Sequence, residues 1–93
     1  MRFSEMSLKD WITATLEERL DPTRLVVEDE SQRHAGHAGW REGGETHFRI
    51  DVVSKAFEGK TRIERHRMVN GILAQAFERG LHALAIQAKA PGE

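Results

Sequence analysis

This chain contains no cysteine, and that absence closes several kinds of chemistry to it. Without thiols it can form no disulfide, no thiolate nucleophile and no metal site made only of its own cysteines. It also has no apolar run near the roughly 20 residues that a helix needs to cross a bilayer. Its formal net charge of −1 gives no overall attraction to nucleic acid or to acidic membranes. Any thiolate chemistry in which this protein takes part must therefore use a partner's thiolates.

The composition is that of one small globular domain. With 39% hydrophobic and 31% charged residues, the chain is globular rather than disordered in character. A chain of 93 residues has a thin core, because a domain of this size buries only about 60–65% of its unfolded surface. The N-terminal segment MRFSEMSLKDW lacks an apolar signal core. We therefore expect a cytoplasmic protein with no membrane partner.

The first third of the chain is predicted to form a helix followed by a short strand. The helix is indicated by apolar residues that recur every three or four positions, namely Leu8, Trp11, Ile12, Leu16 and Leu20. Ser4 or Ser7 can cap its first turn. The Asp21-Pro22 step ends it, because the residue before a proline disfavours helical geometry. Residues 25–27 then predict a strand.

The second half of the chain predicts another strand and a long helix. Phe48, Ile50 and Val52 alternate with polar residues, which is the pattern of a half-buried strand. Thr61 and Glu64 have the spacing of a capping box, in which each side chain bonds the other residue's backbone amide. The helix that follows is predicted to bury one face, made of Val69, Ile72, Leu73, Ala76 and Phe77.

The end of the chain completes the predicted fold. Gly80 is placed to end the long helix as its C′ residue, where a left-handed conformation costs glycine little. Leu84 and Ile86 continue as a last strand. The order αββααβ predicts one α+β domain over residues 1–93, with helices on one face of a three-stranded mixed sheet. Residues 31–44 are polar and contain several glycines, which predicts an exposed functional loop.

Three segments resemble the BolA family: ETHFRI at 45–50, RHRMV at 65–69 and GLHALAIQ at 80–87. The resemblance covers about residues 5–90 and implies a BolA-like domain with the topology of a type II KH domain. A KH domain clamps RNA with a GxxG loop, whereas the matching junction FEGKTRIER has only Gly59. The expected fold is therefore KH-like without the RNA clamp.

His82 follows Gly80 at the expected start of the last strand. Small neighbouring residues leave its ring accessible, and from the residues alone a surface or capping histidine is the commoner interpretation. The resemblance implies a more specific role. In the BolA family, the histidine of the HALAIQ motif is the C-terminal ligand of a shared iron–sulfur cluster.

Two further histidines, His34 and His37, lie in the segment RHAGHAGW of the predicted loop. An H-x-x-H spacing can bring two imidazoles to one metal ion, but two solvated loop histidines fit so short a pattern equally well. The resemblance implies a second cluster ligand on this loop. Alignment of ESQRH with the usual start of the family's loop favours His34, with His37 as the alternative.

The remaining histidines, His47 and His66, are not predicted to be ligands. His47 is opposite in phase to Phe48 and Ile50, so it should face away from the core in a structural or surface role. His66 fits a partly buried position near a helix start, where its arginine neighbours would repel a metal cation.

A shared cluster has a definite chemical basis in a protein without cysteine. Two histidines can replace two cysteines on one iron of a [2Fe–2S] cluster, as they do in Rieske centres. The resemblance implies a heterodimer with a monothiol glutaredoxin, which contributes its cysteine and bound glutathione. It implies iron–sulfur cluster trafficking or iron and redox regulation as the function. Alone, the protein is expected to be a monomer without a cluster.

Other classes of function have weaker support. The sequence has no nucleophile motif, phosphate-binding loop or metalloprotease motif, so an enzyme is not expected. DNA-binding transcriptional regulation, a role also attached to the BolA family, is the main alternative. It would use the basic residues at the helix start, namely Lys60, Arg62, Arg65 and Arg67. Glu58 and Glu64 interrupt this basic group, and a solvated helix face is the plainer interpretation. A third possibility is an interaction module that binds a partner without metal.

Overall fold

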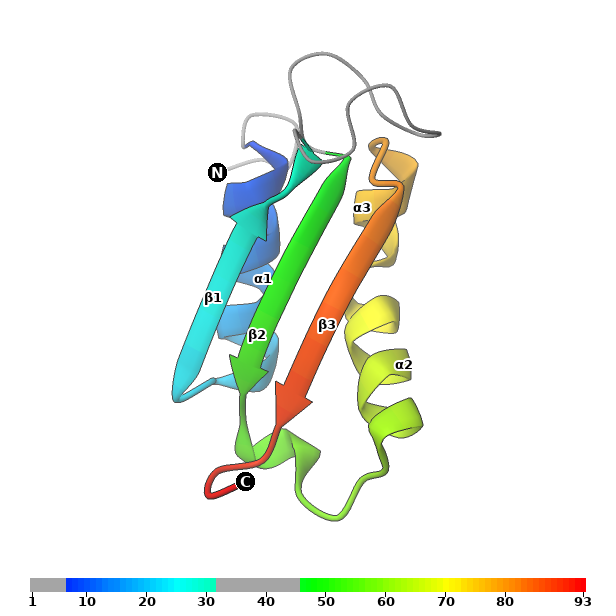
Figure 1. Ribbon diagram of the computed structural model, residues 1–93. Helices are drawn as coiled ribbons and strands as arrows, with labels where there is room; N and C mark the ends of the chain where they lie inside the picture. The colour runs from blue at the N-terminus through cyan, green and yellow to red at the C-terminus, as the bar shows by residue number, and fades with distance from the viewer. Residues whose placement is uncertain (1–6, 32–45) are drawn as a thin grey trace.

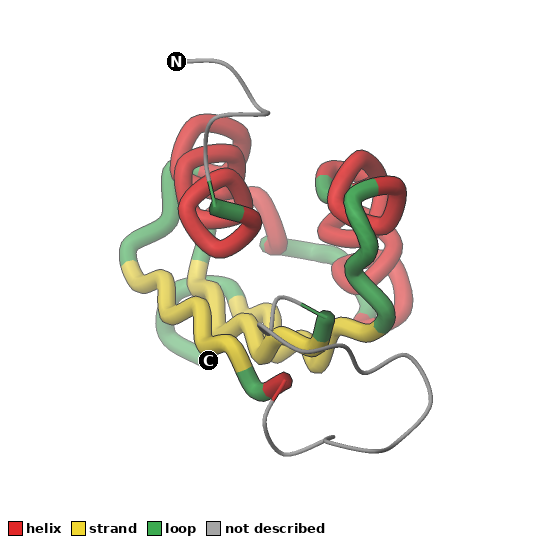
Figure 2. Tube along the Cα trace, turned by 90° about the horizontal axis from the view of Figure 1, so that it is seen from above, coloured by secondary structure: helices red, strands yellow, loops and turns green. Residues whose placement is uncertain are grey.

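The protein is a three-stranded sheet with its helices on one face (Figures 1 and 2). The computed structural model describes residues 7–31 and 46–93. Its elements are α1 (Leu8–Leu20), β1 (Arg24–Asp29), β2 (His47–Val53), a 3-10 turn η3 (Lys55–Phe57), α2 (Arg62–Ile72), α3 (Ala74–Glu78) and β3 (Ala83–Lys89). The sheet order is β1-β2-β3, with β1 antiparallel and β3 parallel to β2. The predicted α+β class and mixed sheet are confirmed.

Helix α1 begins and ends close to where its sequence predicts. The Asp10 backbone N–H donates to the Ser7 hydroxyl at 3.1 Å, so Ser7 is the N-cap. Asp21 ends the helix in the left-handed conformation, with φ of 44°, directly before Pro22. The residues that α1 buries repeat at helical spacing and are Leu8, Ile12, Leu16 and Leu20. The alternative cap, Ser4, lies outside the described residues.

The core lies between the sheet and the helices. Strand β2 is central and contributes Phe48, Ile50 and Val52, all fully buried on its helix-facing side. Against them pack α1 and, beside it on the same face, residues of the α2–α3 segment, chiefly Val69, Leu73 and Ala76, together with Phe57 of η3. No helix in the described ranges is long and apolar enough to cross a membrane.

The predicted long C-terminal helix is in fact two helices that meet at Leu73. The Ala76 N–H donates to the Leu73 carbonyl, an i→i−3 bond of 2.9 Å that tightens the turn. A tighter turn rotates the residues that follow around the helix axis. Phe77, which we predicted on the buried face, is instead 41% exposed.

Helix α3 ends in a Schellman motif that leads directly into the start of β3. The Leu81 N–H donates to the Ala76 carbonyl at 3.1 Å, and the Gly80 N–H donates to the Phe77 carbonyl at 3.2 Å. Gly80 has φ of 107°, as predicted for a C′ glycine. Leu81 is buried, so the turn is fixed by an apolar contact as well as by hydrogen bonds.

Candidate histidine site

His82 combines a fixed backbone with an exposed side chain. It follows the Schellman turn, and its N–H donates to the Thr46 carbonyl at 2.7 Å. The Ala83 N–H donates to the same carbonyl at 3.2 Å, so β3 begins against the residue that precedes β2. The His82 side chain is exposed. An imidazole in this position is available to a ligand or a partner protein.

Ser31 and Thr46 tie the end of β1 to the start of β2. The Ser31 hydroxyl accepts from the Thr46 N–H at 2.9 Å and from the His47 N–H at 3.2 Å. It also donates to an Asp29 carboxylate oxygen at 2.5 Å. Ser31 is only 1% exposed, so the prediction of an exposed loop from residue 31 is wrong at its first position. Asp29, Ser31 and Thr46 are referred to below as the loop anchor.

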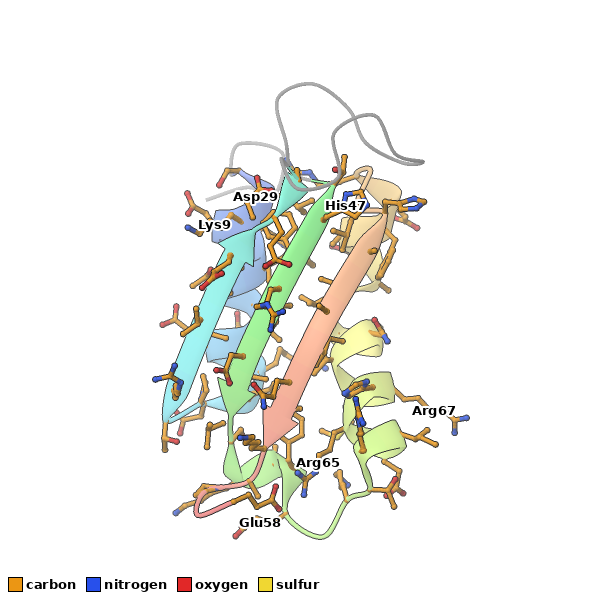
Figure 3. All side chains as sticks on the ribbon, viewed as in Figure 1. Lys9, Asp29, His47, Glu58, Arg65 and Arg67 are labelled. Atoms are coloured by element: carbon orange, nitrogen blue, oxygen red, sulfur yellow. The ribbon has the colours of Figure 1, made fainter. Side chains whose placement is uncertain are left out.

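The buried neighbour of His82 is His47. Their ring centroids are 5.2 Å apart, with an angle of 51° between the ring planes. His47 Nδ1 lies 2.9 Å from the Thr46 hydroxyl oxygen, and the residue is only 6% exposed. A surface role for His47 is therefore wrong, although the alternation of β2 correctly placed it opposite the helix-facing residues. Figure 3 shows His47 near the start of β3, whereas Arg65 of α2 lies near the opposite end of that strand.

The loop histidines, His34 and His37, lie outside the described residues. The loop anchor nevertheless limits how far they can be from His82. An extended chain spans about 3.3–3.6 Å per residue, so His34 is at most about 10 Å along the chain from Ser31 and His37 about 20 Å. Ser31 bonds Thr46, whose carbonyl binds the His82 N–H. Chain length thus permits either loop histidine to approach His82.

The described residues alone do not provide a complete metal site. In residues 7–31 and 46–93, no three histidine, aspartate or glutamate side chains are grouped so that they could hold a metal ion. His66, which we did not expect to be a ligand, lies on α2 beside the basic residues. A metal centre at His82 would therefore need ligands from residues outside the described ranges, from a partner, or from both.

The predicted basic group divides between two surfaces. Lys60, Arg62 and Arg65 line a hollow of about 500 Å³ between the start of α2 and residues 86–89 of β3. Arg67 instead lines a separate groove of about 380 Å³ between α1 and α2. The two ends of β3 therefore carry different chemistry, with His82 at its start and the basic hollow at its end.

Two of the amide groups at the start of α2 are satisfied by its capping box. The Thr61 N–H donates to the Glu64 carboxylate at 2.7 Å, and the Glu64 N–H donates to the Thr61 hydroxyl at 3.1 Å. These hydrogen bonds to Thr61 lower the pKa of Glu64. The helix start therefore presents a carboxylate beside the basic residues, as the sequence predicted.

Arg65 is held within the protein. Its guanidinium donates to both carboxylate oxygens of Glu93, the longer bond being 2.8 Å, and to the Ala88 carbonyl at 3.2 Å. The Arg65 side chain is only 11% exposed. The hydrogen bonds with Arg65 and Ala90 lower the pKa of Glu93 to about 2. An internal carboxylate thus occupies the fork of Arg65, which counts against this residue as a nucleic-acid contact, and its role there stays a prediction.

A family model described as "BolA-like protein" matches residues 16–93, which include both the histidine site and the basic hollow. The chain belongs to the BolA-like family. The match confirms the resemblance seen in the motifs at 45–50, 65–69 and 80–87. The order and pairing of the strands agree with it, as the structural comparison shows.

This BolA-like chain is similar to two curated plant proteins and to a solved domain. It is 49% identical over 80 residues to "Protein BOLA1, chloroplastic" of Arabidopsis thaliana, covering 84% of this chain and 50% of that protein. It is also 49% identical over 86 residues to "SufE-like protein 1, chloroplastic/mitochondrial" of the same organism, covering 88% of this chain and 23% of that protein. The chain thus spans no more than half the length of either relative.

The solved BolA domain of SufE1 from Arabidopsis thaliana has the same fold as this chain. It superposes with a TM-score of 0.84 at 46% identity, over 92% of this chain and 94% of the other. The BolA-like α+β domain with a mixed three-stranded sheet is thereby confirmed. The similarity to KH domains remains a prediction.

Proposed function

We propose that this BolA-like protein is the partner of a monothiol glutaredoxin and supplies histidine ligands to a [2Fe–2S] cluster shared between them. The observation that supports this most is the exposed imidazole of His82 on a fixed backbone beside the loop anchor. The function would be to pass on a cluster, or to sense iron or redox state, rather than to catalyse a reaction.

The donor atoms of the chain fit such a shared cluster. With no cysteine, it can contribute only imidazoles, carboxylates or backbone groups. Histidine can replace cysteine on one iron of a [2Fe–2S] cluster and raises its reduction potential, because neutral imidazole donates less charge than thiolate. The glutaredoxin cysteine and glutathione would supply the remaining thiolates. His82 would hold the iron from this chain, together with His34 or His37.

The test is anaerobic reconstitution of a cluster on an equimolar mixture of this protein and a monothiol glutaredoxin with glutathione. We expect visible circular dichroism that differs from that of glutaredoxin alone, and we expect this difference to disappear in His82→Ala. Calorimetric titration of the apo proteins should show that His82→Ala still binds the partner. His66→Ala is the matched control and should behave as wild type, because His66 lies on α2, next to the other end of β3.

Two results with the mixture would overturn the proposal. One is a wild-type mixture whose spectrum is only the sum of its components. The other is an unchanged cluster spectrum in His82→Ala. The protein alone, purified in air, should be colourless because it has no thiolate, and a stoichiometric cluster on the monomer would also contradict a shared site.

A second candidate function, DNA binding, is favoured by the basic hollow. Lys60 and Arg62 line it with Lys89, while Arg65 is bound to Glu93. Binding through these residues should weaken steeply as salt rises, because each phosphate contact releases counterions. Alanine at Lys60, Arg62 and Lys89 together should abolish retardation of duplex DNA, whereas Arg67→Ala, in the separate groove, should have little effect. An unchanged gel shift for the triple variant would remove this surface from consideration.

A further inference from the structure

His82 and His47 form a pair that the proposed function does not yet use. Among the hydrogen bonds, ion pairs and ring contacts of the described residues, the His82 side chain takes part only in the contact with the His47 ring. The centroid separation of 5.2 Å and the tilt of 51° are those of two rings in direct contact. An exposed histidine without such a neighbour would sample several rotamers.

The His47 ring that makes this contact is itself firmly held. Its Nδ1 lies 2.9 Å from the Thr46 hydroxyl oxygen, and burial leaves the residue only 6% exposed. Its backbone is tied on both sides, because its N–H donates to the Ser31 hydroxyl and its carbonyl accepts from the Glu30 N–H at 2.8 Å. The ring is therefore a rigid surface against which another side chain can be oriented.

The sheet register brings the two rings together. His47, the first residue of β2, is the partner of Ala83 in the parallel pairing with β3. His82 directly precedes Ala83, and both donate their N–H to the Thr46 carbonyl. Thr46 therefore acts on both residues. Its carbonyl positions the His82 backbone, and its hydroxyl holds the His47 ring that contacts the His82 side chain.

We infer that His47 is a positioning residue for His82, fixing the orientation of its imidazole by ring contact before any metal or partner arrives. This inference rests on the proposed function for its purpose, since it explains how an exposed ligand avoids disorder. Groups that orient a metal ligand commonly affect metal affinity about 10–100-fold. His47 is assigned this supporting role because its ring is buried and its Nδ1 already faces Thr46.

The test compares three substitutions at one position. His47→Ala removes the ring, and His47→Leu removes it while filling the space, which covers the case in which the alanine variant does not fold. His47→Phe keeps a ring of similar shape and should rescue the contact. His66→Ala, a partly buried histidine on α2, is the control for loss of an imidazole elsewhere.

The first measurement uses the apo protein and needs no glutaredoxin. Side-chain NMR of selectively labelled histidine reports the order of the His82 ring, while amide spectra report folding. We expect His82 to become mobile in His47→Ala and His47→Leu and to stay ordered in His47→Phe and His66→Ala. An equally ordered His82 ring in folded His47→Leu would overturn the inference, and so would a mobile one in His47→Phe.

The second measurement follows retention of the reconstituted cluster by visible circular dichroism. His47→Leu should lose the cluster to a chelator about 10-fold more readily than wild type, with His47→Phe close to wild type. If the wild-type mixture forms no shared cluster, the proposed function fails. The NMR result on the apo protein still decides the role of His47, so the two failures are distinguishable.

Discussion

The contact between Arg65 and Glu93 shows how single residues decide which charges a partner can reach. The sequence gives Arg65 the same standing as Lys60, Arg62 and Arg67, because all four lie in one basic stretch. In the structure Arg65 binds Glu93 in the fork geometry that carboxylates favour. A residue 28 positions away along the chain thus removes one cation from the basic surface.

The first prediction concerns the pKa of Glu93, the carboxylate of this pair. Hydrogen bonds from Arg65 and, to a smaller extent, from Ala90 lower the pKa of Glu93 from 4.5 to about 2, so the pair stabilises the fold fully above the unfolded pKa. That stabilisation should be lost as pH falls from about 4.5 towards 2. Carbon NMR titration should find a pKa near 2 for the Glu93 carboxyl in wild type and a higher pKa in Arg65→Gln, where the Ala90 N–H can still donate to it.

The control for this titration is Lys60→Gln, which removes a nearby exposed cation without touching the fork. It should leave the Glu93 midpoint close to the wild-type value. Glu93 is 46% exposed, so raised salt should move the wild-type midpoint upward by screening. A wild-type midpoint near 4.5 at low salt would show that the pair does not form in solution.

The turn between α3 and β3 positions the histidine site at the scale of elements, and the second prediction tests it. Gly80 has φ of 107°, a conformation that a β-branched residue adopts only with strain. Gly80→Val should lower the free energy of unfolding by about 1–3 kcal/mol. Thermal and urea unfolding measure this, and equal stability of the two proteins would mean that the turn forms differently.

Gly71, within α2, is the matched control for this substitution. A Cβ added there meets nothing within 4 Å, and the residue is helical and exposed. Gly71→Ala should therefore raise stability by about 0.5–1 kcal/mol, because alanine loses less backbone entropy than glycine in a helix. Opposite signs at the two glycines would separate the effect of positive φ from that of an added methyl group.

An element could be predicted from the sequence where residues close together in the chain specify it. Spacing of apolar residues was sufficient for α1 and β2, and the cap of α2 followed from two residues three positions apart. The break at Leu73 was not predicted, because the apolar spacing runs on from Val69 to Ala76. Gly71, two residues before the break, is a helix-weakening residue that the apolar pattern does not take into account. The break rests on a backbone hydrogen bond that no side-chain pattern specifies.

The histidine pair was missed for a related reason at the scale of the whole molecule. Alternation assigns His47 a face of its strand, but its neighbour depends on the pairing of β2 with β3 and on the register of that pairing. The two residues are 35 positions apart, and local patterns contain no register. His82 was predicted from its motif, whereas its contact with the His47 ring could be found only from the tertiary structure.

The whole molecule also sets the last prediction, which concerns the division of roles among His34, His37 and His82. His82 is held by the Schellman turn, the Thr46 carbonyl and the His47 ring. Among the described histidines, buried His47 is the one that contacts it. His34 and His37 lie outside the described residues and are three positions apart in one predicted loop, so we expect either imidazole to substitute in part for the other. Loss of His82 should therefore be the more severe defect.

The expected series is graded. In the reconstituted glutaredoxin complex, His34→Ala should weaken the visible circular dichroism more than His37→Ala does, with neither abolishing it. The double variant should approach the loss seen in His82→Ala, and all variants should still bind the apo partner in calorimetric titration. A double variant with a wild-type spectrum would show that the loop contributes no ligand. The second imidazole would then have to come from elsewhere, and buried His47, already in contact with His82, would be the first residue to test.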